Sequence, residues 1–150
     1  MLESVYYYLK EFGFNDKEID FFEDENEDMF STNNIEIEKN INFLFDKGLE
    51  HEEVLDVIRR NPDMLTVKNN RLEAYDKIFN NELDMDNDMI KKLILSYPDT
   101  YVESPIDLQN IINYLKEKKY DKEYIRNLII DNPKIISMDL SEFEKEIILK

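Results

Sequence analysis

The sequence predicts an all-α fold, arranged as a superhelical solenoid of about four and a half repeats with a period of about 35 residues. Three prolines mark this period, because Pro62, Pro98 and Pro133 stand 36 and 35 residues apart. Apolar residues share the period, and one of their columns is Ile19, Val54, Ile90 and Ile125. No segment alternates between apolar and polar residues as a β-strand does, so helices are the only regular elements we expect.

Each repeat is predicted to contain two helices and a short 3-10 turn. In the second repeat, apolar residues within 37–45 follow a helical spacing, and Gly48 stands where helices commonly end in a left-handed residue. The second helix is expected to start near Glu50 and to end before Pro62, since the residue preceding a proline disfavours the α conformation. The turns at the prolines are expected to bury one large side chain each, namely Leu65, Tyr101 and Ile136.

Cap residues predict where the second helices begin. A residue with a side-chain acceptor recurs at this place, at Asn15, Glu50, Asp86 and Asp121. Such side chains accept backbone hydrogen bonds at a helix N-terminus, where negative charge is also favoured. Asn15 with Glu18 has the spacing of a capping box, and so has Ser141 with Glu144. A last helix is therefore expected to open at Ser141.

One column of the repeat departs from the pattern. Leucine recurs at Leu9, Leu44 and Leu115 in the first helices, but Asn80 occupies the aligned position of the third repeat. The whole chain, residues 1–150, is nevertheless predicted to be a single domain. Its repeats are expected to cover residues 2–36, 37–71, 72–106 and 107–139, followed by a closing half-repeat at 140–150.

Two segments combine a leucine-bearing helix, a tight turn, an aliphatic helix and a proline followed by hydrophobic residues. They are Leu44-Phe45-Asp46-Lys47-Gly48-Leu49 with Pro62-Asp63-Met64-Leu65, and Leu115 with Pro133-Lys134-Ile135-Ile136. This pattern resembles the mTERF repeat of mitochondrial and chloroplast transcription termination factors. The resemblance implies two antiparallel helices and a 3-10 turn per repeat, stacked into a curved superhelix of either hand. It also implies binding of double-stranded nucleic acid along a basic concave face.

Composition predicts a cytoplasmic protein. The chain has no cysteine, so it offers neither disulfides nor thiolate metal ligands. Its first residues are acidic, unlike a secretion signal or a transit peptide, and its uncharged runs are shorter than a membrane span. Abundant isoleucine, asparagine and lysine indicate an AT-rich genome, so we expect a bacterial or phage-encoded protein that does not engage a membrane.

Negative charge is concentrated in the first third of the chain. Residues 1–50 hold 4 Lys and Arg against 14 Asp and Glu, a net charge of −10, whereas residues 101–150 reach only −2. One interpretation is a solubilising face. The other is a binding face for a basic protein surface, and by imitating nucleic-acid phosphates such a face can inhibit a nuclease or a CRISPR effector. The residues expected there are Glu23, Asp24, Glu25, Glu27 and Asp28.

Two aromatic residues extend this candidate acidic face. Tyr7 aligns with Asn42 and Phe21 with Asp56, so rings stand where the next repeat has polar side chains. We expect both rings to be exposed and to contribute to a protein interface, because aromatic residues often anchor interfaces. The alternative is that a terminal repeat uses bulkier residues to complete its own core.

A second candidate surface is basic and would bind nucleic acid, as the mTERF resemblance implies. It comprises Lys91, Lys92, Lys116, Lys118, Lys119, Lys122 and Arg126. The net charge of −16 opposes this function, because binding duplex nucleic acid relies on cations that displace condensed counterions. Lysines are also common at protein surfaces in turns and at helix ends, so their presence there does not by itself indicate nucleic-acid binding. Nucleic-acid binding is therefore the alternative to a protein partner.

No enzyme is predicted. His51, the single histidine, stands among glutamates at the expected start of a helix, and no cysteine is available as a nucleophile. Residues 84–88 resemble the opening of an EF-hand loop, but Met89 occupies the position of its glycine. We therefore expect no catalytic residue, no cofactor and no metal site.

Overall fold

The computed structural model of the chain describes residues 3–30 and 33–148. Nine α-helices occupy these residues, and the described segments contain no β-strand. The prediction of an all-α protein is therefore confirmed. The chain divides into two compact units, an N-terminal unit Met1–Val67 and a C-terminal unit Lys68–Lys150, a division that the repeat pattern did not indicate.

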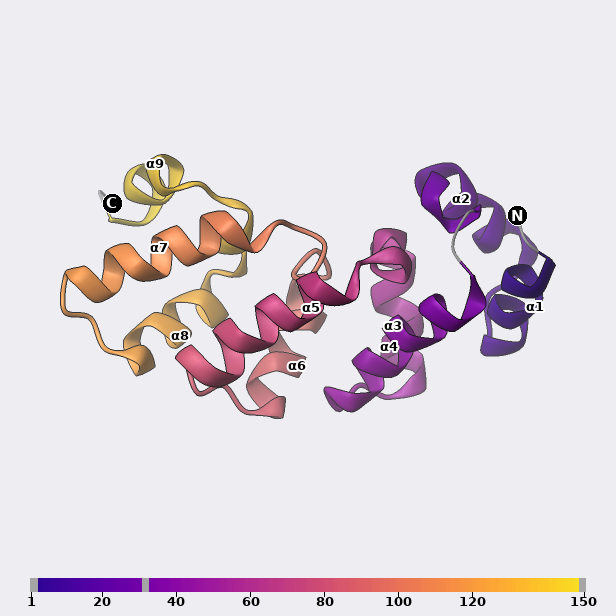
Figure 1. Cartoon of the computed structure of the whole chain (residues 1–150), viewed down its shortest axis with the longest axis horizontal. Coiled ribbons are helices and arrows are strands. Elements are labelled where there is room, and N and C mark those ends of the chain that lie inside the picture. The colour runs from indigo at the N-terminus through magenta and orange to yellow at the C-terminus, as the bar shows by residue number, and fades with distance from the viewer. Residues whose placement is uncertain (1–2, 31–32, 149–150) are drawn as a thin grey trace. The chain divides into compact units, whose positions relative to one another are not determined.

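The N-terminal unit contains two helix pairs, each followed by a 3-10 turn (Figure 1). The first pair is α1 Glu3–Phe12 and α2 Asp16–Glu25, followed by η1 Glu27–Phe30. The second pair is α3 Asn34–Asp46 and α4 His51–Arg60, followed by η2 Pro62–Thr66. Helix α1 packs against α2 and α3, and η2 contacts both α3 and α4.

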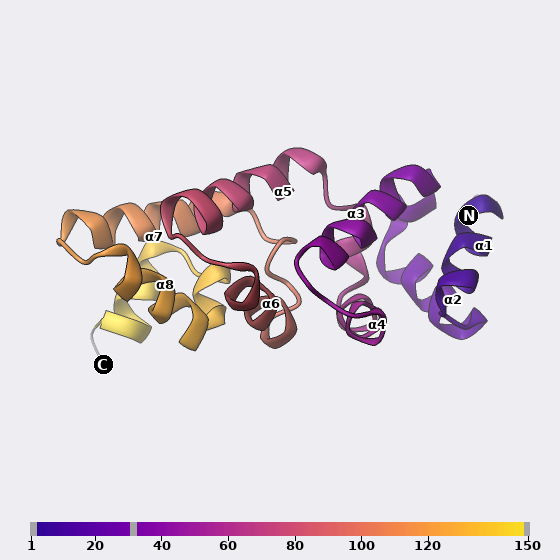
Figure 2. The same cartoon turned by 90° about the horizontal axis from the view of Figure 1, so that it is seen from below.

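The C-terminal unit continues the alternation of helices and short turns (Figure 2). Its first pair is α5 Asn69–Asp76, extended by the π-helical segment η3 Lys77–Glu82, and α6 Asn87–Ser96. The second pair is α7 Pro105–Glu117 and α8 Lys122–Asp131, followed by the 3-10 helix η4 Pro133–Ser137. Helix α9 Leu140–Phe143 then continues as the π-helical segment η5 Glu144–Ile148. Helix α7 packs against α5, α8 and α9, and α6 packs against α8.

The predicted starts of the second helices are confirmed. The N-cap residues of α2, α4, α6 and α8 are Asn15, Glu50, Asp86 and Asp121. The prediction for the last helix was wrong, because Asp139 and not Ser141 is the N-cap of α9. Asp139 has the extended backbone that a cap requires, and its carboxylate accepts the backbone N–H of Glu142 at 2.8 Å. Ser141 lies two residues later, inside the helix.

The four second helices end in the same local structure. The residue after each helix donates its backbone N–H to the carbonyl four residues earlier, at 2.8–3.0 Å, and these residues are Asn26, Asn61, Tyr97 and Asn132. Prolines follow the last three directly, as predicted. Each of the three turns buries the expected side chain to 1% exposure or less, namely Leu65, Tyr101 and Ile136. Pro62 and Pro133 open 3-10 helices, whereas Pro98 opens an irregular turn.

The structure corrects the alignment at Asn80 by one residue. Asn80 is exposed, and the neighbouring Phe79 is fully buried. The backbone N–H that follows each turn donates to one residue of the preceding helix, and the four acceptors are Leu9, Leu44, Phe79 and Leu115. Phe79 therefore completes the leucine column. The extra residue of the third repeat lies within the π-helical segment η3, since a π-helical turn holds more residues than an α-helical one.

A residue with positive φ closes the first helix of each pair. The four φ values are 136° at Gly13, 94° at Gly48, 51° at Asp84 and 71° at Lys119. Two of these positions carry glycine, which adopts this conformation without steric cost, and two do not.

The two kinds of residue at this position predict opposite effects of substitution. Gly48→Ala is expected to reduce the free energy of unfolding by about 1–2 kcal/mol, because a Cβ is disfavoured in the left-handed region. Lys119→Gly removes that Cβ and is expected to raise the free energy of unfolding by up to about 1 kcal/mol. Urea unfolding measures both. Lys118→Gly serves as the control, since Lys118 has a φ of −82° and gains nothing from glycine.

Candidate functional site

The outward face of α2 carries an exposed aromatic ring among carboxylates. Phe21 is 50% exposed, whereas the adjacent Phe22 is buried. Residues three and four positions apart share a helix face, so Asp24 and Glu25 lie on the side of Phe21. Asp20 lies on this face too, one turn before Asp24, and it is exposed. The sequence prediction did not include Asp20, although its spacing of four residues from Asp24 would have placed both on the same helix face.

The other predicted acidic residues lie at or just beyond the end of α2. Glu23 is half-buried, and Glu27 opens η1 with an exposed side chain. Asp28 belongs to η1 as well, but its side chain lies outside the described part of the structure. Among the described residues, no Lys or Arg lies within ion-pair distance of Glu23, Asp24, Glu25 or Glu27. We call Asp20, Phe21, Glu23, Asp24, Glu25 and Glu27 the acidic face.

Acidic residues at the start of α2 behave differently, because they hold the N-terminal unit together. The carboxylate of Asp16 accepts a hydrogen bond from the Tyr6 hydroxyl and forms an ion pair with Lys10 at 3.0 Å. These hydrogen bonds lower the pKa of Asp16. Burial alone would raise the pKa of Glu18, but the backbone N–H of Asn15 and the guanidinium of Arg59 outweigh it and lower that pKa. Only the C-terminal part of α2 therefore has unpaired carboxylates.

Tyr7 is exposed, as predicted, and its ring contact lies within its own helix α1. The ring is 57% exposed and makes an edge contact with Tyr6, with centroids 5.8 Å apart. Phe21 makes its ring contact with Phe22 on α2. Within the described residues, the rings of Tyr7 and Phe21 do not touch. The two predicted aromatic residues thus mark separate positions on α1 and α2.

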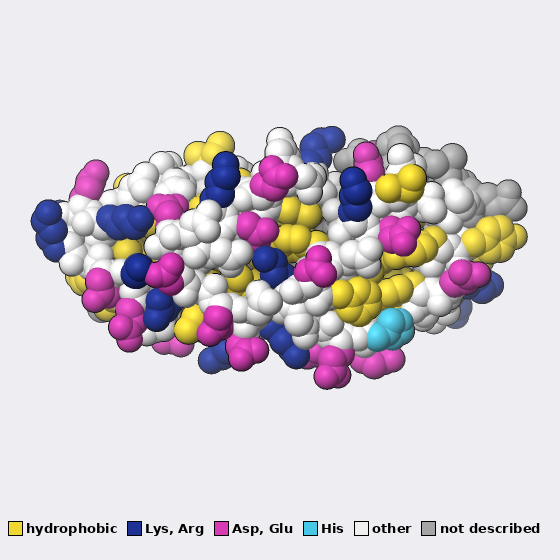
Figure 3. Space-filling view, turned by 60° about the horizontal axis from the view of Figure 1, so that its bottom comes forward, with side chains coloured by type: hydrophobic (Ala, Val, Ile, Leu, Met, Phe, Trp, Pro, Cys, Tyr) yellow, Lys and Arg dark blue, Asp and Glu magenta, His cyan; other side chains and the backbone are white. Residues whose placement is uncertain are grey.

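The two compact units differ in charge. The N-terminal unit holds 6 Lys and Arg against 18 Asp and Glu, a net charge of −12. The C-terminal unit holds 13 against 17, a net charge of −4. On the face drawn in Figure 3, part of the N-terminal unit also presents hydrophobic side chains (yellow) beside the single histidine (cyan). The predicted concentration of negative charge thus falls within one structural unit.

The predicted basic residues of the C-terminal unit are largely engaged with the unit itself. Lys116 forms an ion pair with Glu82 at 2.9 Å, and Lys122 forms one with Asp84 that lowers the pKa of this carboxyl. Arg126 donates from Nη1 to the backbone carbonyl oxygen of Leu83 at 3.2 Å. These three cations hold α7 to the end of η3, and α8 to the turn that follows η3.

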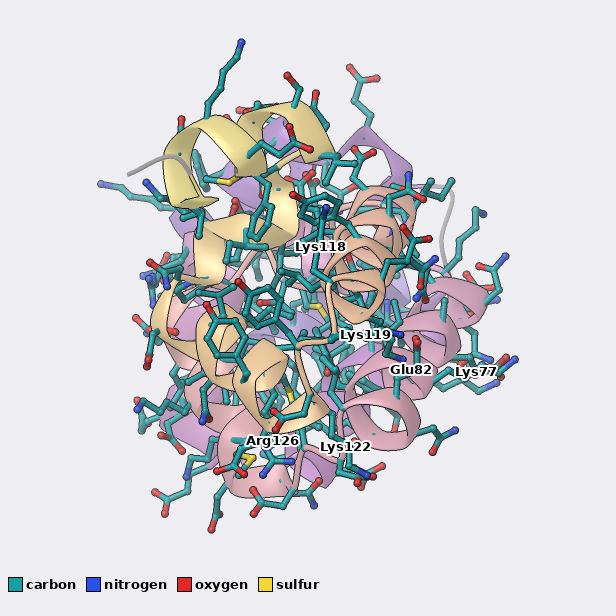
Figure 4. The ribbon with its side chains drawn as sticks, turned by 90° about the vertical axis from the view of Figure 1, so that its left-hand side faces the viewer. Lys77, Glu82, Lys118, Lys119, Lys122 and Arg126 are labelled. Carbon is teal, nitrogen blue, oxygen red and sulfur yellow. The ribbon has the colours of Figure 1, made fainter. Side chains whose placement is uncertain are left out.

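The remaining predicted cations lie on one helix and in one turn. Lys91 and Lys92 lie on α6, and Lys118 and Lys119 lie in the turn between α7 and α8. Lys118 places its Nζ atom 5.6 Å from the centroid of the Tyr114 ring. Figure 4 shows that the labelled lysines are spread over this end of the unit. The predicted basic residues therefore come from α6, α7 and α8 and from the turn between α7 and α8.

Two exposed rings in the C-terminal unit were not predicted. Tyr120 is 40% exposed and Tyr124 is 44% exposed, and their rings stack with centroids 4.5 Å apart and an interplanar angle of 16°. The spacing of four residues between two tyrosines at the start of a predicted helix was a usable signal for this contact.

His51 has a structural role in the N-terminal unit. Its Nε2–H donates to the carbonyl oxygen of Phe12 at 2.6 Å, and the two rings lie 4.6 Å apart. In the part of the chain that the structure describes, no three or more His, Asp or Glu side chains are arranged to hold a metal ion. The residues that resembled an EF-hand loop serve other contacts, because Asp84 pairs with Lys122 and Asp86 caps α6.

Two further findings concern membrane-spanning helices and similarity to known proteins. None of the helices in the described segments combines the length and apolar character needed to cross a membrane. The sequence matches no protein-family model and no curated protein. The mTERF resemblance therefore stays a prediction from the repeat pattern.

Proposed function

We propose that this protein is a non-enzymatic binding protein whose acidic face engages a basic surface of another protein. The observation that carries the proposal is an exposed Phe21 on a helix face with unpaired carboxylates, in a unit with a net charge of −12. Aromatic side chains at the centre of an interface supply affinity. Carboxylates around them accelerate encounter with a basic partner and exclude acidic ones.

One form of this function is mimicry of nucleic acid. Closely spaced carboxylates present negative charge as phosphates do, so they suit the cationic channel of a nuclease or a CRISPR effector. A protein that occupies this channel would inhibit the enzyme without any chemistry of its own. We further propose a cytoplasmic, bacterial or phage-encoded protein, in keeping with the cysteine-free composition.

We also propose that the helices form a superhelical solenoid of mTERF-like repeats. Three facts support this architecture: the shared ends of the second helices, their four N-caps, and the four positive-φ positions, all at spacings of 35 or 36 residues. Solenoids display extended surfaces that suit macromolecular partners.

Substitution of the exposed aromatic residues tests the proposal. Phe21→Asp and Tyr7→Asn introduce the residues found at the aligned positions of the next repeat. We expect thermal stability to stay nearly unchanged, since both rings are at least half exposed. Phe21→Asp is expected to weaken binding of a basic protein, captured from host lysate and then purified, by about tenfold or more. Ile35→Asn, at a residue 60% exposed on α3, is the matched control.

Neutralising the carboxylates should have a kinetic effect. The test variant combines Glu23→Gln, Asp24→Asn, Glu25→Gln and Glu27→Gln. We expect slower association with the purified partner and a flatter dependence on salt, because exposed charges act mainly on the encounter. The control variant carries the same change of charge at Glu11, Glu36, Glu38 and Glu52. If both variants slow association equally, the acidic face is only a solubilising surface.

Binding of duplex DNA tests the alternative function. We expect weak binding or none near physiological salt, because Lys116, Lys122 and Arg126 are already engaged within the unit. A salt titration of binding measures this. Micromolar affinity that falls steeply with salt, and falls again in the variant Lys116→Glu/Lys118→Glu/Lys119→Glu, would make nucleic-acid binding the function instead.

A further inference from the structure

The turn between α7 and α8 exposes a residue that is buried in the equivalent turns. Tyr120 follows the positive-φ residue Lys119 and is 40% exposed. The residues at the same position in the other three turns are at most 5% exposed, and they are Phe14, Leu49 and Met85. In all four turns, the backbone N–H of this residue donates to the carbonyl oxygen of the leucine-column residue in the preceding helix. The turn is therefore built like the others but is not covered like them.

A helix start covers the equivalent turn in the N-terminal unit. There the first two turns of α4 lie against residues 12–14. His51 donates to the carbonyl oxygen of Phe12, and a Cβ atom built on Gly13 would meet the Leu55 side chain at 3.5 Å. The covering helix thus supplies a hydrogen-bond donor in its first turn and an apolar side chain one turn later.

The same helix position covers a turn in the C-terminal unit. Helix α8 lies against residues 83–85, where Lys122 pairs with Asp84 and Arg126 donates to the carbonyl oxygen of Leu83. Lys122 and Arg126 occupy the places of His51 and Leu55 in the repeat. In both units, therefore, the cover is the N-terminal half of an α-helix that crosses the turn.

Nothing among the described residues covers the turn at 118–120 in this way. Its exposed surface consists of the stacked rings of Tyr120 and Tyr124, with Lys118 and Lys119 beside them. Neither lysine forms an ion pair within the described part of the chain. Figure 4 shows both lysines at this end of the C-terminal unit. We call these four residues the tyrosine–lysine surface.

We propose that the tyrosine–lysine surface binds the N-terminal half of an acidic, amphipathic helix of a partner protein. An apolar side chain of that helix packs on the two tyrosine rings, as Leu55 packs on the turn at Gly13. Carboxylates in its first turn pair with Lys118 and Lys119, and negative charge is favourable at a helix N-terminus. This surface lies on the C-terminal unit, and the inference does not depend on the function proposed for the acidic face.

Other occupants fit the surface less well. Single-stranded nucleic acid needs free aromatic faces and a continuous groove of cations. Here each tyrosine ring covers one face of the other, which leaves too little free ring surface for a run of stacked bases, and Glu117, Asp121 and Glu123 interrupt the basic residues. A symmetric pair of two copies would bring four lysines into one interface, and their mutual repulsion disfavours it.

A peptide with the sequence of residues 49–61, which contains α4, is a suitable probe. This helix already covers the equivalent turn at 12–14, and its first turn carries Glu52 and Glu53. Titration into the full-length, isotope-labelled protein is followed by NMR. We expect saturable shifts at the backbone amides of Tyr120 and Tyr124. A second peptide with Glu52→Lys and Glu53→Gln keeps the capping-box spacing but reverses the charge, and we expect it to bind about tenfold more weakly.

Variants of the protein locate the binding. Tyr120→Ala/Tyr124→Ala is expected to reduce the affinity for the first peptide by about tenfold or more, with an unchanged far-ultraviolet spectrum. Ile106→Ala removes an exposed side chain of the same unit, 69% exposed, and is expected to bind as the wild type does.

Four results would overturn the proposal. The first is equal binding of the two peptides of opposite charge. The second is a set of shifts that maps to the turn at 12–14 instead of the tyrosine–lysine surface. The third is binding of an oligothymidine in the same assay without binding of the first peptide, which would assign the surface to nucleic acid. The fourth is self-association in sedimentation experiments that the double tyrosine variant abolishes, which would assign the surface to a second copy of the chain.

Discussion

Replacing Leu65 by alanine is expected to reduce the free energy of unfolding of the N-terminal unit by about 2–5 kcal/mol. Leu65 is fully buried in η2, the segment that packs against both α3 and α4. The substitution removes buried apolar atoms and leaves a cavity that the surrounding helices fill only in part. Urea unfolding followed by circular dichroism measures the loss.

The control for this substitution is Ile35→Ala in the same unit. Ile35 is 60% exposed, so its truncation is expected to change the free energy of unfolding by no more than about 0.5 kcal/mol. If Leu65→Ala were as mild as Ile35→Ala, η2 would not be part of the core, and the equivalence of the proline turns would lose its physical basis.

Replacing Asn40 by alanine is expected to cost about 2–4 kcal/mol, because it leaves buried carbonyl groups without a donor. The Nδ2 group of Asn40 donates to the carbonyl oxygens of Met64, Leu65 and Val67 at 3.2, 3.0 and 2.9 Å. Asn40 is only 6% exposed, so water cannot easily replace these hydrogen bonds. The amide of a single side chain therefore fixes the path of η2 across α3.

Two further variants separate hydrogen bonding from packing. Asn40→Leu fills the space but offers no donor, and we expect it to be about as destabilising as Asn40→Ala. Asn42→Ala changes an exposed asparagine of the same helix and is expected to be neutral or slightly stabilising, since alanine is the better helix former. Recovery of stability in Asn40→Leu would show that lost packing, and not the missing donor, is the cause.

Features with local causes could be predicted from the sequence. The N-caps, the stops before proline and the left-handed Gly48 each depend on a few neighbouring residues, and the structure shows them where they were expected. Two overlapping capping-box patterns occur around the start of α9, and spacing alone does not decide between Asp139 and Ser141. The preceding 3-10 helix ends at Ser137, and the extended backbone of Met138 and Asp139 places the helix start directly after Asp139.

Features with non-local causes could not be predicted. Lys116 and Glu82 stand 34 residues apart, and their ion pair depends on the reach of two long side chains and not on the repeat. Asn40 lies in a column whose other members are buried and apolar or aromatic, at Val5, Tyr75 and Ile111. Its amide is useful only because two carbonyl groups of η2 and the carbonyl group of Val67, just after η2, meet there. The exposure of Tyr7 was predicted, but the edge contact of its ring with Tyr6 was not.

The π-helical segment η3 has a consequence for how this chain tolerates changes in length. One residue inserted into an α-helix rotates everything after it by about 100°, which would turn apolar side chains away from the core. In η3 the wider turn holds the additional residue, so Leu72 before it and Met85 after it both stay buried. An insertion or deletion in the evolution of this chain can thus occur in the middle of a helix and leave its neighbours' contacts intact. Natural variation in repeat length need not be confined to loops.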